Sequence, residues 1–309
     1  GIKVGLYYSP PNWYFERDTK NFSRVKDHNV GPDGKERTTK PTPEQLAAQK
    51  KAYIELVRGQ IKELLTRYGK IDLLWFDGRI PGTSGDEVMS LDEMRKLQPG
   101  VVIDGRMNGH GDFLTYERKL GTTKPVTGWA ELCNPWTSAW PYVIGNKSRA
   151  NGFILGQFVL CRSLKVNYLL DIGPKPDGTL QDETYSNMTI VANWMKANSE
   201  SIKGTTPLPA GESASVPATA SGHVRYLFAM PKFKTASGND FAAGSAYPED
   251  QLPSPDATLT FSGKLGTPAD VKLLGDGSSL EYSVSNNIVS VQLPASKRTK
   301  LVDVVKVEF

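Results

Sequence analysis

Residues 71–78 place one carboxylate at the end of a strongly apolar segment. The run Ile-Asp-Leu-Leu-Trp-Phe is typical of a buried strand, and Asp77 and Gly78 follow it directly. An ionised carboxylate is costly to bury without partners, so Asp77 should lie where water, a substrate or hydrogen-bond donors reach it. Catalytic residues of (β/α)8 barrels stand at such strand ends, which makes Asp77 a candidate for chemistry. The alternative is that Asp77 only caps the turn that follows, as aspartate often does.

A long helix should lead into this strand. Thr42, Pro43 and Gln45 give a capping box with proline at the first helical position, and Gly69 ends the helical pattern of apolar residues. The other elements that the pattern predicts in this part are strands at 2–9, 101–104, 125–129 and 166–172, and helices at 91–97, 148–164 and 181–202. Strands separated by helices indicate a parallel sheet with crossover connections.

The pattern changes near residue 206. Alternating apolar segments at 223–229, 257–261, 271–274 and 288–293 are separated by Gly, Pro, Ser and Asp, which is typical of an antiparallel β-sandwich. We therefore expect an α/β portion at 1–206 and a C-terminal β-sandwich at 207–309. Fewer strands are predicted before this boundary than the eight that a closed barrel needs. Either the fold is not a closed barrel, or its N-terminal strands are absent from this chain.

Composition narrows the function classes. Among the 309 residues, Lys and Arg exceed Asp and Glu by four, 37 against 33, and no basic cluster interleaved with aromatic residues occurs, so no nucleic-acid partner is expected. No apolar run approaches the roughly 18 residues that span a bilayer, so no membrane partner is expected. Cys133 and Cys161 form no metal-binding pattern with the three histidines. Neither a metal nor another cofactor is expected.

Four motifs in register resemble consecutive landmarks of the glycoside hydrolase family 29 α-L-fucosidases. They are Gly5-Leu6-Tyr7-Tyr8-Ser9-Pro10, Leu74-Trp75-Phe76-Asp77-Gly78, Asn167-Tyr168-Leu169-Leu170-Asp171-Ile172-Gly173-Pro174, and the segment from Trp194 to Gly204-Thr205. The resemblance implies a retaining exo-glycosidase on a (β/α)8-like barrel, with Asp77 as its nucleophile. It also implies that the barrel is incomplete at its N-terminus, since family members carry strands upstream of the first motif.

Retaining hydrolysis needs a second carboxyl group that protonates the leaving oxygen. The segment from Gly111 to Glu117 resembles the one in which many family members carry this acid/base glutamate, two residues after a threonine. Glu131 is the rival, because it lies beside Trp129 near another predicted strand. We favour Glu117, although for either glutamate the alternative is a surface ion pair, and Arg118 and Lys119 lie next to Glu117.

Sugar recognition needs aromatic faces and paired hydrogen-bond donors. Trp75 should point to the same side of its strand as Asp77, and Arg106 matches a family arginine that contacts the sugar. The expected substrate-binding residues, which cluster near predicted strand ends, are Tyr8, Trp13, Trp75, Arg106, Trp129 and Trp140. The alternative for the tryptophans is that each fills space in the core, and Trp136 belongs to the same group.

Some features depart from the family pattern. None of His28, His110 and His223 lies in a motif that matches the family's fucose-binding histidines, and Asp171 replaces a more usual asparagine. Two functional classes therefore remain open: an exo-α-L-fucosidase acting on fucosylated oligosaccharides or glycoconjugates, and a degenerate, non-catalytic carbohydrate-binding homologue. The family habit of acting on external glycans implies a secreted or periplasmic location. The sequence leaves the oligomeric state open.

Overall fold

The computed structural model describes residues 1–12, 15, 42–82 and 85–309. These residues divide into two compact units, Gly1–Thr115 and Tyr116–Phe309. The domain boundary expected at residue 206 falls inside the second unit, at strand β7 (Thr206–Pro207). At that point the chain changes from helices and parallel strands to antiparallel sheets.

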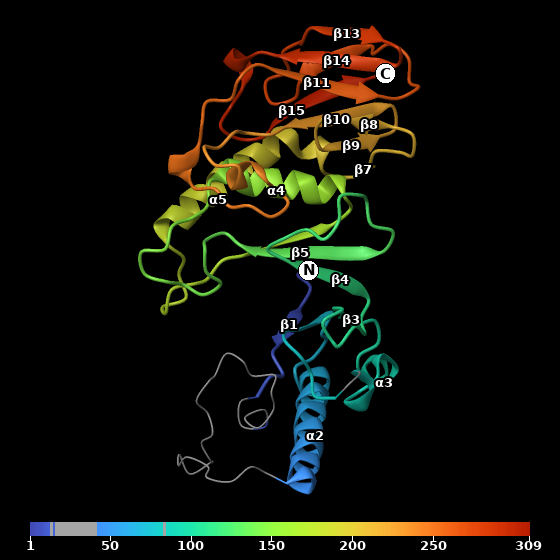
Figure 1. Ribbon diagram of the computed structural model, residues 1–309, viewed down its shortest axis with the longest axis vertical. Coiled ribbons are helices and arrows are strands. Elements are labelled where there is room, and N and C mark those ends of the chain that lie inside the picture. The colour runs from blue at the N-terminus through green and yellow to red at the C-terminus, as the bar shows by residue number, and fades with distance from the viewer. Residues whose placement is uncertain (13–14, 16–41, 83–84) are drawn as a thin grey trace. The chain divides into compact units, whose positions relative to one another are not determined.

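A parallel three-stranded sheet and a long helix form the first unit (Figure 1). Strands β1 (Gly5–Tyr8), β2 (Leu73–Phe76) and β3 (Val102–Ile103) pair in that order. Helix α2 (Pro43–Arg67) carries the predicted capping box. In it, the side chain of Thr42 accepts the backbone N–H of Gln45, and the side chain of Gln45 accepts the backbone N–H of Thr42. Helix α3 (Leu91–Leu97) has the bounds predicted from the sequence.

Helix α2 determines which face of the first sheet is available for a site. Its buried side chains recur every four residues, from Tyr53 through Val57 and Ile61 to Leu65, and share one apolar core with Leu74 and Phe76 of β2. Both β2 residues are fully buried there. Because successive strand residues point to opposite faces, Trp75 and Asp77 point away from this core.

The second unit begins with strands and helices that also belong to the α/β part of the chain. Strand β4 (Phe113–Glu117) crosses the division between the units and is followed by β5 (Trp129–Pro135) and β6 (Asn167–Asp171), in the order β4-β5-β6. Strands β5 and β6 are parallel. Helices α4 (Asn151–Ser163) and α5 (Asp182–Asn198) lie near the predicted positions.

Two strands of this region differ from the sequence-based prediction. The strand expected at 125–129 lies instead at 129–135, and β4 was not predicted. Strand β5 contains Glu131, Asn134 and Pro135, which have low strand propensity. Its seven residues are held by pairing with β6 and by packing of Ala130 and Leu132 in a core with Cys161 of α4. Tertiary contacts thus override the local preference.

Two antiparallel sheets follow, and their facing residues form one apolar core. The first sheet has the order β12-β15-β10-β9-β7 and the second β13-β14-β11-β8. The bounds are β8 (Ser213–Ala214), β9 (Ala218–Ser221), β10 (Val224–Ala229), β11 (Ala257–Ser262), β12 (Asp270–Leu273), β13 (Tyr282–Ser285), β14 (Ile288–Leu293) and β15 (Asp303–Glu308). Short 3-10 turns occur at Gly85–Glu87, Ser199–Ser201, Ser237–Asn239, Pro248–Asp250 and Ala295–Lys297.

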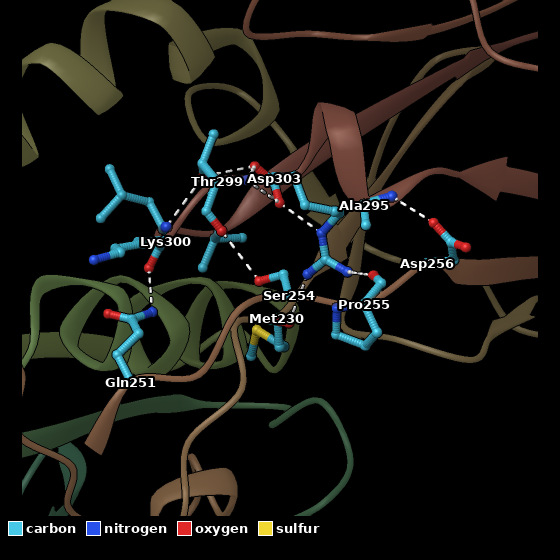
Figure 2. Close-up of polar contacts among 12 residues, drawn as sticks. Met230, Gln251, Ser254, Pro255, Asp256, Ala295, Thr299, Lys300 and Asp303 are labelled. Atoms are coloured by element: carbon cyan, nitrogen blue, oxygen red, sulfur yellow. Dashed lines mark hydrogen bonds and ion pairs between the residues drawn. The ribbon is translucent and has the colours of Figure 1, made fainter. Parts of the chain in front are cut away.

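A buried ion pair fastens the loops at one end of these sheets. The Arg298 Nε atom donates to Asp303 Oδ2 at 2.7 Å, and each side chain is only 3% exposed. Arg298 also donates to the carbonyls of Met230 and Pro255. Figure 2 shows Asp303 together with Thr299, whose hydroxyl donates to Asp303 Oδ1 at 2.7 Å. Segments far apart in the sequence are therefore joined at one charged centre.

Candidate functional site

Asp77 follows β2 at the carboxyl end of the first sheet. Its backbone N–H donates to the Tyr8 carbonyl at 3.0 Å, which continues the pairing of β1 and β2 by one residue. Gly78 then turns the chain at φ +75°, a conformation that favours glycine. A Cβ there would also lie 2.5 Å from Pro11 Cγ. The strand and the turn together fix the Asp77 carboxylate, whose side chain is 38% exposed.

Two side chains and one backbone N–H donate to the Asp77 carboxylate. The Tyr7 hydroxyl donates to Oδ2 at 2.5 Å, and Arg106 Nη1 donates to Oδ1 at 2.7 Å. The Gly78 N–H also reaches Oδ1, at 2.9 Å. Charge-assisted hydrogen bonds of this kind are among the strongest in proteins. They orient the carboxylate while leaving it accessible.

Trp75 joins the same cluster through its ring faces. Tyr7 pairs with Trp75 in the sheet, and their rings stack with centroids 5.6 Å apart and planes 20° apart. The Arg106 guanidinium carbon lies 4.6 Å from the Trp75 ring centroid, a cation–π arrangement. The predicted residues Asp77, Trp75 and Arg106 are therefore brought together, and Tyr7 completes the group.

Tyr7 was missed by the sequence analysis, which chose Tyr8. The structure places Tyr8 on the opposite face of β1, where its hydroxyl donates to Gln60 of α2 at 2.7 Å and its ring meets Phe76 edge to face. Parallel pairing of β1 with β2 aligns Tyr7 with Trp75, so the face that carries Asp77 also carries Tyr7. The register of these strands was the missing signal.

The Tyr7 hydroxyl remains a donor over the working range of pH. Local burial, the hydrogen bond to Asp77 and the negative charge of Asp77 raise the pKa of Tyr7 to about 12. A neutral phenol can donate to the carboxylate, whereas a phenolate would be repelled by it. Tyr7 is therefore protonated throughout the neutral range.

This protonation state can be checked by ultraviolet titration. We expect the tyrosinate absorbance difference between the wild-type protein and Tyr7→Phe to stay near zero up to about pH 11, because a pKa of about 12 leaves Tyr7 neutral below it. An unperturbed tyrosine would instead add one ionising group near pH 10. A wild-type excess of one tyrosinate that forms with a midpoint near pH 10 would contradict the contact with Asp77.

A rigid turn after β3 positions Arg106. Asp104 is fully buried and accepts the Phe76 N–H at 2.9 Å, and the Gly105 N–H donates to the Phe113 carbonyl at 2.9 Å. Asp112 accepts the Ile103 N–H at 2.8 Å. At Gly111 a Cβ would lie 2.3 Å from the Asp104 carbonyl oxygen, so the two ends of the turn approach closely only with glycine there. These contacts fix the backbone on both sides of Arg106.

The two candidate acid/base glutamates lie at different positions along neighbouring strands of the second unit. Glu117 is the last residue of β4 and is exposed. The next N–H, that of Arg118, donates to the Cys133 carbonyl at 3.0 Å, so the end of β4 lies beside Cys133. Glu131 is 7% exposed, lies two residues earlier on β5, and accepts from Asn167 at the start of β6. Glu117 is thus nearer to the carboxyl end of these strands.

The remaining predicted residues have varied surroundings. Trp140 lies beneath Arg118, whose guanidinium carbon is 5.0 Å from the ring centroid. Trp129 opens β5 at the end opposite Pro135 and is 64% exposed. Trp136 is buried in the second unit. Trp13 lies outside the described residues.

In the described part of the chain, the histidines and possible metal ligands add no further centre. His110 lies in the turn that carries Arg106, where its N–H donates to the Met107 carbonyl. The Nε2 atom of His223 lies 3.6 Å from Glu308 Oε1 in the antiparallel part, and His28 lies outside the described residues. Across the described ranges, no three His, Cys, Asp or Glu side chains gather as metal ligands would. Within the same ranges, no helix combines the length and apolar character that crossing a membrane requires.

An aspartate at the end of a parallel strand, held by an arginine and framed by aromatic rings, places the chain among α/β proteins with strand-end carboxylate sites. The sequence profile of the alpha-L-fucosidase family matches residues 1–200. The chain belongs to the alpha-L-fucosidase family.

Curated relatives carry the same family name. Alpha-L-fucosidase from Dictyostelium discoideum is 25% identical over an alignment of 223 residues that covers 67% of this chain and 43% of the relative. Tissue alpha-L-fucosidase from Bos taurus is 27% identical over an alignment of 228 residues that covers 67% of this chain and 42% of the relative. The aligned region thus spans less than half the length of either relative.

Solved structures share the fold. Alpha-L-fucosidase isoenzyme 1 from Paenibacillus thiaminolyticus superposes with a TM-score of 0.71 at 22% identity, covering 100% of this chain and 72% of that protein. A GH29 alpha-L-fucosidase from Bacteroides thetaiotaomicron gives a TM-score of 0.68 at 19% identity, covering 100% and 68%. The match extends over both the α/β part and the antiparallel sheets.

Proposed function

We propose that the chain is the catalytic part of a retaining exo-α-L-fucosidase, with Asp77 as nucleophile and Glu117 as acid/base. The observation that carries this proposal is the Asp77 carboxylate at a strand end, held by Tyr7 and Arg106. The family membership supplies the fucoside substrate class. In the Bacteroides thetaiotaomicron relative, a covalent intermediate with 2-fluoro-fucosyl fluoride was trapped by a glutamate-to-glutamine substitution, which supports a two-step route.

In the first step, an Asp77 oxygen attacks the anomeric carbon of the fucoside. The carbon–oxygen bond to the leaving group breaks as a glycosyl ester forms, and Glu117 transfers its proton to the departing oxygen. The hydrogen bonds from Tyr7 and Arg106 keep the Asp77 carboxylate at a fixed orientation. Positioning of this kind lowers the entropic cost of attack.

In the second step, the Glu117 carboxylate takes a proton from water. That water attacks the anomeric carbon from the side that the leaving group occupied, and Asp77 leaves as a carboxylate. Two inversions at the same carbon give net retention. Each group returns to its starting protonation state, so the cycle uses only water.

Glu117 is favoured over Glu131 because of its place on the strands. Catalytic groups of this architecture stand at the carboxyl ends of strands, and Glu117 ends β4. It is also exposed, as a group that meets both leaving group and water must be. Glu131 is buried and near the start of β5, where Asn167 donates to it. We assign Glu131 a structural role.

The same proposal covers the architecture and the setting. We propose that the strands before residue 206 belong to a (β/α)8-like barrel and that residues 207–309 form a C-terminal β-sandwich. The shared core of the two antiparallel sheets supports the second assignment. Fucosylated oligosaccharides or glycoconjugates are the proposed substrates, and a secreted or periplasmic location is proposed from the family.

The acid/base assignment predicts a loss that depends on the leaving group. We expect Glu117→Gln to lower kcat/KM about 10²–10⁴-fold for an alkyl α-L-fucoside, which needs protonation of its leaving oxygen. The loss should be much smaller for the 2,4-dinitrophenyl fucoside, whose leaving group departs as an anion. Steady-state kinetics with both substrates measures the difference.

Glu131→Gln is the matched control, because it makes the same change at the rival glutamate, on the neighbouring strand β5. It should lower both rates by a similar small factor. A dependence on the leaving group in Glu131→Gln, together with its absence in Glu117→Gln, would exchange the two roles. If the loss depends on the leaving group in neither variant, the acid/base is another residue.

A further inference from the structure

The loop at residues 137–148 follows β5 and is fastened at its base. Thr137 and Ser148 form an antiparallel bridge, and the Arg149 N–H donates to the Trp136 carbonyl at 2.8 Å. Asn146 crosses the loop, accepting from the Ser138 hydroxyl at 2.7 Å and donating to Thr137 Oγ1 at 2.9 Å. The loop therefore has a defined conformation that its own contacts stabilise without a ligand.

A second contact fixes the middle of this loop against β6. Gly173 follows β6, and a Cβ there would lie 2.3 Å from the Tyr142 nitrogen and 2.6 Å from the Pro141 carbonyl carbon. The loop backbone therefore crosses directly over the chain that leaves β6. Both ends and the middle of the loop are held by backbone contacts at the carboxyl side of these strands.

Arg118 connects the loop to the proposed acid/base. It is the residue after Glu117 and has a positive φ of 58°, which turns the chain sharply at the end of β4. Its Nη1 atom donates to the Ser138 carbonyl at 3.4 Å, and its guanidinium lies over the Trp140 ring. Arg118, the residue next to Glu117, thus contacts the Trp140 side chain at the middle of the loop.

The tip of the loop presents apolar side chains to solvent. Val143 is 44% exposed and Ile144 is 86% exposed. The tip is a closed turn, in which the Asn146 N–H donates to the Val143 carbonyl at 3.1 Å and Gly145 has φ +77°. Burying an apolar side chain of this size on ligand binding is favourable. A preformed loop gains more of that free energy, because little ordering is needed.

We infer that the loop at 137–148 receives the aglycone, the part of the substrate beyond the fucosyl oxygen, and sets the enzyme's preference for it. An acid/base protonates the leaving oxygen, so the surface attached to Glu117 is the one that meets the leaving group. Trp140 and Ile144 take the apolar face of the sugar ring that carries the fucosyl group, and Arg118 is the positioning residue for Trp140. This inference rests on the proposed function of Glu117.

The test compares three fucosyl donors that differ only in the leaving group. They are α-L-fucosyl fluoride, 4-nitrophenyl α-L-fucoside, and a disaccharide with fucose linked to galactose. We expect Ile144→Ala to lower kcat/KM for the disaccharide about three- to tenfold, from the loss of roughly three partly buried carbons. The fluoride has no group for the loop to touch and should change less than twofold. A drop for the nitrophenyl donor alone would identify an aryl aglycone instead of a sugar.

Ile190→Ala is the matched control, since Ile190 is an exposed isoleucine on α5, 40% accessible. It should alter none of the three rates. Equal losses for the fluoride and the disaccharide in Ile144→Ala, or no loss for any donor, would overturn the inference. Arg118→Gln should resemble Ile144→Ala in its dependence on the donor, whereas a merely structural role would affect all donors equally.

Binding measurements distinguish a failure of this inference from a failure of the proposed function. If the wild-type protein hydrolyses none of the donors, the proposed function fails. The inference about the loop can then still be tested, because titration calorimetry measures the affinity for the disaccharide and for free L-fucose. Weaker disaccharide binding in Ile144→Ala, with L-fucose binding unchanged, would support the loop as the aglycone surface. Identical disaccharide affinities for Ile144→Ala and the wild-type protein, or disaccharide binding by neither, would reject it.

Discussion

Asp77→Asn should abolish nearly all turnover of 4-nitrophenyl α-L-fucoside while leaving the protein folded. The asparagine keeps the size of the side chain but removes the negative oxygen that forms the glycosyl ester. The asparagine oxygen can still accept from Arg106, and the NH2 group that replaces the other oxygen can donate to the Tyr7 hydroxyl, so the local geometry should be kept. Removing the nucleophile of a double-displacement enzyme leaves only binding and the acid/base, so we expect a loss of at least about 10³-fold in kcat.

Asp72→Asn is the matched control for this substitution. Asp72 comes just before the same strand, at its opposite end, where it accepts the Val4 N–H at 3.0 Å and pairs with Lys70 at 3.3 Å. It should retain normal kinetics. Wild-type activity in Asp77→Asn would reject the nucleophile assignment. No activity in the wild-type protein, combined with measurable binding of a fucosylated oligosaccharide, would favour the non-catalytic carbohydrate-binding alternative.

Much of the cluster around Asp77 was predictable because it depends on local sequence. The apolar run before Asp77 indicates a buried strand, and alternation along that strand puts Trp75 on the same face. Arg106 follows the next strand of the sheet, so parallel order brings it to the same edge. These inferences need only the period of a strand and the direction of its neighbours. The contact of Arg106 with Asp77 agrees with them.

Tyr7 and Tyr8 show where local sequence stops being sufficient. The two side chains are chemically identical, and the short sequence of β1, Gly-Leu-Tyr-Tyr, does not alternate between apolar and polar residues. Which tyrosine faces Asp77 is decided by the register against β2, and a shift of one residue would exchange them. Register depends on contacts across about 70 residues of sequence, between Tyr7 and Asp77. A single sequence does not specify it.

The second unit was harder to predict for a related reason. Strand β5 contains a proline, an asparagine and a glutamate, so its strand character comes from β6 and α4 and not from propensity. The position of Glu131 could not be judged while the strand was placed at 125–129. With β5 at 129–135, Glu131 lies near its start and Glu117 at the end of its neighbour. The structure therefore changes the grounds for choosing between the two glutamates.

The antiparallel part should depend strongly on its buried ion pair. We expect Asp303→Ala to lower the free energy of unfolding by about 3–5 kcal/mol, because it leaves the Arg298 guanidinium buried without its carboxylate. Thr299 would also lose the acceptor for its N–H and its hydroxyl. Urea unfolding followed by circular dichroism measures the shift.

Two further variants distinguish an unpaired charge from a simple loss of packing. Arg298→Met combined with Asp303→Leu removes both charges together, and replacing a buried pair by apolar groups is often close to neutral. The double variant should therefore be more stable than Asp303→Ala alone. Glu249→Gln breaks an exposed pair with Lys147 and should leave the midpoint unchanged. If Asp303→Ala unfolds at the wild-type urea concentration, the pair is not what joins Met230, Pro255 and Thr299, and the stability of these loops must come from the apolar core beneath them.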